Sequence, residues 1–344
     1  MSGLEKTTTV SINCSFIERY GQIGKPVPVN NLIVRLTNFL SSPPGARFVA
    51  DTLERLTGRR PAGLSEIRAE MFQQGFFQFV FRASARTLSE EKENFCLIVS
   101  KGIPQYATDQ VTADEFQLLS HYHQLLPDRF VEPLAFNRND LTLYSSRLYP
   151  EHLELDLRID GQGGGQVFFI NSDRSSKVFS RPEQDRLLEE MVKTLTLAYE
   201  ANSGKAIAGM KIRAGDFIIR YRSRDDFDMK LICVRMAIEQ CVPSFIFNLV
   251  EYALGLSSVP GVDEITHLGY LFDTKTVFNG LVRAFAAQGL SRTATVKKAT
   301  DWMGQYHRAL DRGELESLKR FWKKLQFEAG FDGLPVYRYR RSDS

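Results

Sequence analysis

Cysteine and histidine are scarce in this chain, and neither is grouped. The 344 residues include four cysteines and five histidines, and no two cysteines form a Cys-x-x-Cys pair. Closely spaced thiols and imidazoles are typical of structural zinc sites, and paired cysteines are typical of a disulfide framework. The sequence therefore predicts neither feature. It favours a reducing compartment, so we expect a cytoplasmic protein.

Long apolar runs are also missing. The first 13 residues are polar and lack the apolar segment of a signal peptide. The most apolar late segment, residues 245–256, contains Asn248 and Glu251 and is too short to cross a bilayer. We therefore expect no transmembrane segment.

The chain has little excess of charge of either sign. Its 44 Lys and Arg residues against 41 Asp and Glu residues give a net charge of +3. A nucleic-acid-binding protein usually carries a larger or more clustered positive excess, so the composition argues against that class. Hydrophobic residues make up 43% of the chain, and 25 of them are phenylalanine, which is enough to bury a sizeable core. A chain of this length suits two or three packed units.

Hydrophobic periodicity divides the chain into three parts. Residues 1–64 form an amino-terminal extension, in which we expect a strand and two helices at 8–16, 30–40 and 46–56. Residues 65–150 alternate as strands do, except for one helical stretch. The order expected there is β-β-β-α-β-β, at 66–72, 78–85, 95–100, 109–126, 130–135 and 141–148.

Residues 151–344 are mainly helical by the same criteria. Pro182 begins a strong helix that runs to about Ala201, and the chain after Pro243 has a helical pattern to about Ala329. Two hairpins are expected among these helices, at 156–170 and 217–234.

Two short motifs coincide with predicted strands of residues 65–150. Residues 74–82 read Gln-Gly-Phe-Phe-Gln-Phe-Val-Phe-Arg, and residues 97–101 read Leu-Ile-Val-Ser-Lys. Together with the strand order they resemble the small lobe of the aminoglycoside phosphotransferase and choline kinase type. The resemblance implies that Gly75 and Gln78 lie near nucleotide phosphates. It also implies that Lys101 pairs with those phosphates and is held by Glu115 on the following helix.

The resemblance continues at residues 212–217, which read Ile-Arg-Ala-Gly-Asp-Phe. It places Asp216 at the position of the catalytic base, which accepts a proton from the acceptor hydroxyl. Tyr221 and Cys233 stand where the family carries its two metal ligands, Asn and Asp. Magnesium prefers carboxylate, amide or water oxygens, so these replacements argue against a bound Mg²⁺ even if ATP binds.

The fold implied is α+β and kinase-like, with two lobes: a small antiparallel β-sheet lobe with one helix, and a larger, mainly helical lobe. The implied domains are residues 65–150 and 151–344, preceded by the extension. Each site residue also has an ordinary interpretation. Gly75 and Asp216 would be turn residues, Lys101 a surface residue at a strand end, and Glu115 a solvated helix position.

Three functions remain open. The first is a degenerate, kinase-like protein that acts by binding a ligand or a protein. The second is an active ATP-dependent phosphotransferase acting on a small-molecule hydroxyl or amine, and the third is an unrelated α+β interaction protein. A protein partner would contact residues 1–64 or the basic amphipathic helix expected around Lys319–Lys324.

Overall fold

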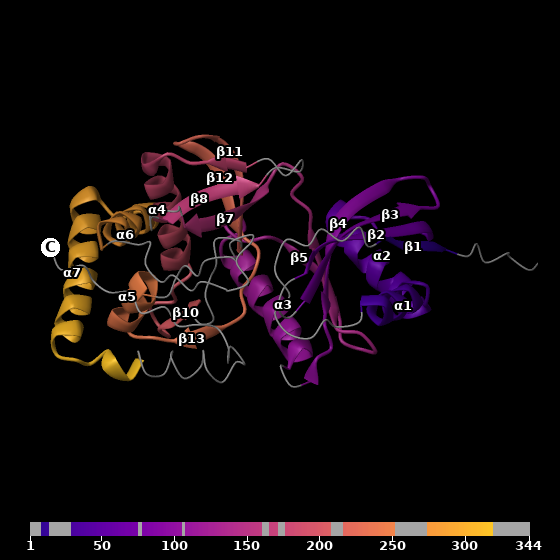
Figure 1. Ribbon diagram of the computed structural model, residues 1–344, viewed down its shortest axis with the longest axis horizontal. Coiled ribbons are helices and arrows are strands. Elements are labelled where there is room, and N and C mark those ends of the chain that lie inside the picture. Colours follow the sequence, from indigo (N-terminus) through magenta and orange to yellow (C-terminus); the bar gives the residue numbers. More distant parts are fainter. Residues whose placement is uncertain are drawn as a thin grey trace, which may run out of the picture. The chain divides into compact units, whose positions relative to one another are not determined.

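The chain forms two compact units in a computed structural model (Figure 1). The first unit comprises residues 1–127 and 131–150, and the second comprises residues 128–130 and 151–344. The structure describes residues 8–13, 29–74, 78–104, 107–159, 165–170, 176–207, 216–251 and 274–318. Both units combine helices with β-sheet, so the expected α+β class is confirmed.

The first unit is built on a sheet whose described strands follow the order β1-β2-β3-β4-β6-β5. All neighbours are antiparallel except β1 and β2, which run parallel. The strands are β1 (Thr9–Asn13), β2 (Leu64–Gln74), β3 (Gln78–Thr87), β4 (Lys92–Ser100), β5 (Pro133–Asn137) and β6 (Leu143–Arg147). The amino-terminal extension therefore adds a strand to the sheet of residues 64–147.

Helices α1 (Val29–Leu40) and α2 (Pro43–Thr57) cover one face of this sheet. Local sequence fixes the ends of α2. The hydroxyl of Ser42 accepts a hydrogen bond from the Gly45 amide, and Gly58 ends the helix at a φ of +74°. Buried residues of both helices, among them Leu36 and Val49, share one apolar core with alternate residues of β2, β3 and β4.

Helix α3 (Thr108–Leu125) contacts β4, β5 and β6. The ring of Phe116 packs against Phe136 and Tyr144, with centroids 5.1 Å and 5.8 Å away. The predicted order β-β-β-α-β-β is thus confirmed for β2, β3, β4, α3, β5 and β6, and both helices of the extension are confirmed as α1 and α2.

The second unit contains a sheet with the order β12-β11-β7-β8-β9, in which neighbours are antiparallel. Its strands are β7 (Leu153–Ile159), β8 (Gly165–Ile170), β9 (Ser176–Val178), β11 (Phe217–Ser223) and β12 (Asp226–Leu231). A separate pair is formed by β10 (Lys205–Ile207) and β13 (Ala237–Glu239). Both predicted hairpins are present, whereas β9, β10 and β13 were not expected.

Four helices are described in the second unit: α4 (Arg181–Leu197), α5 (Val242–Glu251), α6 (Thr274–Ala287) and α7 (Arg292–Asp311). Helix α4 begins with the predicted proline and a capping box between Ser180 and Glu183. The expected helical character after Pro243 is confirmed for α5, α6 and α7. The basic helix expected around Lys319–Lys324 lies outside the described residues.

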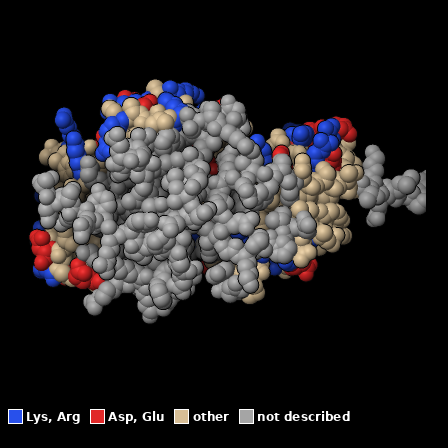
Figure 2. Space-filling view, in the orientation of Figure 1, with Lys and Arg blue, Asp and Glu red and all other residues tan. Residues whose placement is uncertain are grey.

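No helix in the described part of the chain is long and apolar enough to cross a membrane. On the face shown in Figure 2, acidic and basic side chains of the described residues are interspersed. This distribution agrees with the small net charge of the chain.

Candidate functional site

The site residues expected from the sequence belong to different units. Gln78, Lys101 and Glu115 belong to the first unit and Asp216 to the second, so each group is described within its own unit. Gly75 lies outside the described residues.

The structure brings Gln78 and Glu115 together. Gln78 Nε2 donates hydrogen bonds to Glu115 Oε2 at 2.7 Å and to Thr112 Oγ1 at 3.2 Å. The Tyr144 hydroxyl donates to the other oxygen of Glu115 at 3.2 Å. Glu115 is only 2% exposed, so these donors offset part of the cost of removing its carboxylate from water. Glu115 is therefore a buried anchor between the sheet and α3, not a solvated helix residue.

The structure does not bring Lys101 to Glu115. Lys101 Nζ lies 5.2 Å from the centroid of the Phe79 ring, and Phe79 belongs to the core that α1 and α2 cover. The predicted Lys101–Glu115 ion pair is not among the ion pairs of the described residues. Burial lowers the pKa of the Lys101 amine to about 8.

Strand alternation explains where Lys101 lies. Ser100 pairs with Gln78 in the register of β3 and β4, and its hydroxyl donates to Thr108 Oγ1 of α3 at 3.0 Å. Successive side chains of a strand point to opposite faces, so the residue after Ser100 is directed away from α3. Ser100, which the sequence did not single out, thus lies on the same side of the sheet as Glu115.

In the second unit, Asp216 immediately precedes β11 and is bound by Arg235. Arg235 Nη1 donates to Asp216 Oδ2 at 3.1 Å, and Nη2 donates to Oδ1 at 3.0 Å. The carboxylate side chain is 7% exposed and the arginine side chain 27%. Only the fold shows that Arg235 makes this two-pronged ion pair, which is stronger and more directional than a single contact.

Tyr221 and Cys233 replace the two metal ligands of the family that the sequence resembles. The Tyr221 hydroxyl donates a short hydrogen bond to Glu183 Oε1, and Lys177 Nζ lies over the Tyr221 ring, 4.2 Å from its centroid. Burial and the neighbouring Glu183 raise the pKa of Tyr221. Hydrogen bonds from Tyr221 and Ser180 lower the pKa of Glu183 to about 2. Cys233 is buried.

A charged cluster that the sequence did not single out surrounds Glu190 on α4. Arg186 Nη1 donates to Glu190 Oε2 at 2.8 Å, and Lys193 Nζ donates to Oε1 at 2.9 Å. Arg129 Nη1 makes a third, short hydrogen bond to Oε1. Burial alone would raise the pKa of Glu190, but these cations outweigh it and hold the pKa at about 2. The cluster connects α4 to the segment before β5.

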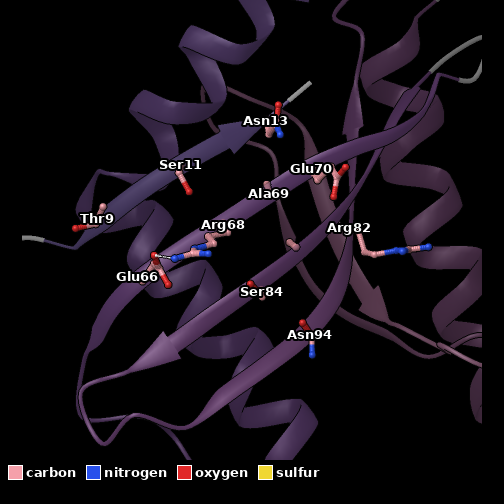
Figure 3. Close-up of a pocket in the computed structure, with 11 residues that line it drawn as sticks. Thr9, Ser11, Asn13, Glu66, Arg68, Ala69, Glu70, Arg82, Ser84 and Asn94 are labelled. Atoms are coloured by element: carbon pink, nitrogen blue, oxygen red, sulfur yellow. Dashed lines mark ion pairs between the residues drawn. The ribbon is translucent and has the colours of Figure 1, made fainter. Parts of the chain in front are cut away.

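A shallow hollow of about 540 Å³ lies on the sheet of the first unit, on residues of β1 to β4 (Figure 3). Its charged lining consists of Glu66, Arg68, Glu70 and Arg82, two of each sign. Arg68 pairs with Glu66 at 2.7 Å. The remaining lining is mostly hydroxyl and amide, as on an ordinary solvated sheet face.

Within the described residues, no group of three or more His, Cys, Asp or Glu side chains is arranged to hold a metal ion. No protein-family model matches the chain, and no curated protein sequence matches it significantly.

Proposed function

We propose that this protein is a degenerate, kinase-like protein that works by binding and does not transfer a phosphoryl group. In this proposal the first unit corresponds to the small lobe of a kinase and the second to the helical lobe. The order of β2, β3, β4, α3, β5 and β6 supports the first correspondence. The β11–β12 hairpin that directly follows Asp216 supports the second.

The two-pronged Asp216–Arg235 ion pair is the observation that carries the proposal. A general base must accept a proton from the reacting hydroxyl, and a carboxylate that binds a metal must turn an oxygen towards it. Both oxygens of Asp216 already accept hydrogen bonds from a guanidinium, which stays protonated at any pH a protein tolerates. Arg235 also places a positive charge next to the carboxylate, and that charge opposes a divalent cation.

The surroundings of the other expected residues agree with a loss of catalysis. Tyr221 is engaged with Glu183, and Cys233 offers a thiol where a hard cation needs oxygen. Lys101 contacts Phe79, so the cation that should neutralise phosphate charge is not held by Glu115. Phosphoryl transfer from ATP needs a lysine and metal ligands that act together on the phosphates. Here the residues at those positions contact other groups of the protein, which supports binding without turnover.

A turnover assay tests the loss of catalysis. Wild-type protein and the Asp216→Asn variant are incubated with ATP and Mg²⁺, and released ADP is measured over hours. We expect both proteins to match the protein-free background. Magnesium-dependent ADP release by the wild type that disappears in Asp216→Asn would overturn the proposal in favour of an active phosphotransferase.

A thermal-shift assay tests the binding. We expect ATP to raise the melting temperature equally with and without Mg²⁺, because no metal is needed to form the complex. A shift that requires Mg²⁺ would contradict metal-independent binding. If ATP gives no shift at all, the nucleotide is not the ligand, and the chain is better described as an interaction protein.

A further inference from the structure

A second hollow of the first unit, of about 560 Å³, lies beside the first half of α2. Its lining also comes from the connection between α2 and β2 and from the turn between β3 and β4. Among the described residues, its charged lining consists of Arg47 and Arg60 alone, and most of the rest is small or apolar: Ala46, Ala50, Pro61, Ala62 and Leu88 are examples. The hollow on the sheet face, by contrast, has a charged lining with two residues of each sign. The hollow beside α2 is therefore both apolar and positively charged.

Leu88 supplies the largest exposed apolar side chain of this hollow. Its amide donates a hydrogen bond to the Gly63 carbonyl at 3.1 Å, which fixes the turn against the connection between α2 and β2. A Cβ atom on residue 63 would lie 2.7 Å from Leu88 Cδ1, so the leucine side chain packs directly on the glycine. Leu88 nevertheless stays 42% exposed, in a turn that otherwise reads Thr-x-Ser-Glu-Glu-Lys. The hollow thus offers a fixed aliphatic surface to a partner.

The positive charge beside the hollow is not neutralised by the described part of the chain. Residues 47–60 contain four arginines, no lysine and two acids, an excess of two positive charges in a chain whose total excess is three. Both acids, Asp51 and Glu54, pair with Nη1 of Arg60 at 2.7 Å. Arg47 is exposed, and it forms no ion pair or side-chain hydrogen bond with another described residue. An anionic partner would therefore meet arginine donors that the protein itself leaves open.

We propose that this hollow binds a segment of a protein partner in which carboxylates flank an aliphatic side chain. The aliphatic side chain packs on Leu88 and the small residues of α2, and the carboxylates pair with Arg47 and Arg60. A guanidinium presents a planar set of donors that matches two carboxylate oxygens at once. Asp51 and Glu54 use only Nη1 of Arg60, so its other nitrogens can still donate. Arginine and apolar side chains side by side are typical of protein interfaces.

The acids of α2 favour a protein segment over an anionic membrane as the occupant. Asp51 lies four residues after Arg47 and four before Arg55, so an acid stands between two arginines on one face of the helix. A membrane surface is negative throughout and would repel Asp51 and Glu54 while it attracts the arginines. A peptide can place its carboxylates opposite the arginines alone. The inference goes beyond the proposed function, since it involves neither a nucleotide nor Asp216.

Fluorescence anisotropy with defined peptides tests the proposal on the full-length chain. The probe is a labelled peptide with one leucine between two pairs of glutamates. A second peptide has serine in place of the leucine, and a third has glutamine in place of each glutamate. Each is titrated with wild type, with Arg47→Gln and with Arg68→Gln. Arg68 is the matched control, because its side chain is 62% exposed and it lines the hollow on the sheet face instead. Melting temperatures check that both variants are folded.

We expect the probe to bind wild type, and Arg47→Gln to weaken binding by about threefold to tenfold while Arg68→Gln leaves it nearly unchanged. On wild type, the serine and glutamine peptides should each bind more weakly than the probe by about the same factor. No binding of the probe to wild type, or equal weakening by the two variants, would overturn the proposal. A serine peptide that binds as well as the probe would overturn the role of Leu88.

Vesicles of phosphatidylserine and phosphatidylcholine test the alternative occupant. We expect the protein not to sediment with them in a way that depends on Arg47. If the vesicles bind through Arg47 and the probe does not bind, the surface is a membrane site and the assignment to a protein segment is wrong. The comparison among the three peptides uses wild-type protein, so it does not depend on the folding of a variant.

Discussion

Removal of the Arg235 guanidinium should destabilise the second unit strongly, because it leaves the Asp216 carboxylate buried without its main partner. Arg235→Met keeps much of the side-chain volume and removes every donor. Breaking a fully buried ion pair from one side costs about 3–5 kcal/mol. The Arg235 side chain is 27% exposed, so water would partly replace it, and we expect a loss of about 2–4 kcal/mol in the free energy of unfolding.

Urea denaturation followed by tryptophan fluorescence measures this loss. Trp302 is buried on α7 of the unit that holds the ion pair, so its emission reports the unfolding of that unit. Arg222→Met is the matched control. Arg222 faces Asp226 at 3.4 Å, with side chains 60% and 62% exposed, and its loss should change stability by less than about 0.5 kcal/mol.

A double variant separates the buried charge from other effects of the substitution. Asp216→Asn removes the charge that Arg235→Met leaves uncompensated, so the double variant should recover at least half of the stability lost in the single variant. If Arg235→Met costs no more than Arg222→Met, the pair behaves like a solvated surface contact. The argument that Asp216 is a structural residue would then fail.

Three further predictions follow from other contacts. Glu190 has a folded pKa of about 2, below its ordinary value of 4.5, so the stability it contributes is present above pH 4.5 and lost as the pH falls towards 2. The melting temperature of Glu190→Gln should therefore lie well below that of wild type at pH 7 and approach it in acid; a constant difference would contradict the pKa. Gly280→Ala would place its Cβ 2.5 Å from Val192 and 2.9 Å from a backbone oxygen of α4, and this overpacking should cost about 1–3 kcal/mol in urea unfolding. Val192→Ala should relieve part of that cost, and a Gly280→Ala variant as stable as wild type would show that α6 and α4 are not this closely packed. Glu115→Gln keeps one oxygen to accept from the Tyr144 hydroxyl, but its amide NH₂ then faces the NH₂ group of Gln78 and leaves two donors without an acceptor. We expect the free energy of unfolding to fall by about 1–3 kcal/mol; an unchanged stability would show that the carboxylate is not needed there.

Lys101 shows why the site was harder to predict than the strands around it. The apolar run before it correctly indicated a strand, and Lys101 directly follows that strand. Whether that lysine meets Glu115 depends on which face of the sheet it takes, and a shift of one residue reverses the face. Ser100 rather than Lys101 contacts α3, because the register of β4 against β3 pairs Ser100 with Gln78.

The sequence by itself determined the elements whose signals are local. The proline at the start of α4 and the strand–helix alternation of residues 64–147 depend on residues a few positions apart, and both were predicted close to their observed positions. These signals act through backbone hydrogen bonds and side-chain periodicity, which a short segment carries in full.

Only the tertiary structure decided the contacts between distant segments. It paired β1 with β2 in parallel, joined Asp216 to Arg235 and brought Arg129 to Glu190 of α4. These partners lie far apart in the chain, and each contact forms because packing of the whole unit places the two residues together. The residues around a charged side chain in the sequence do not show whether it will be solvated or paired with a buried partner, so the local sequence does not distinguish these outcomes.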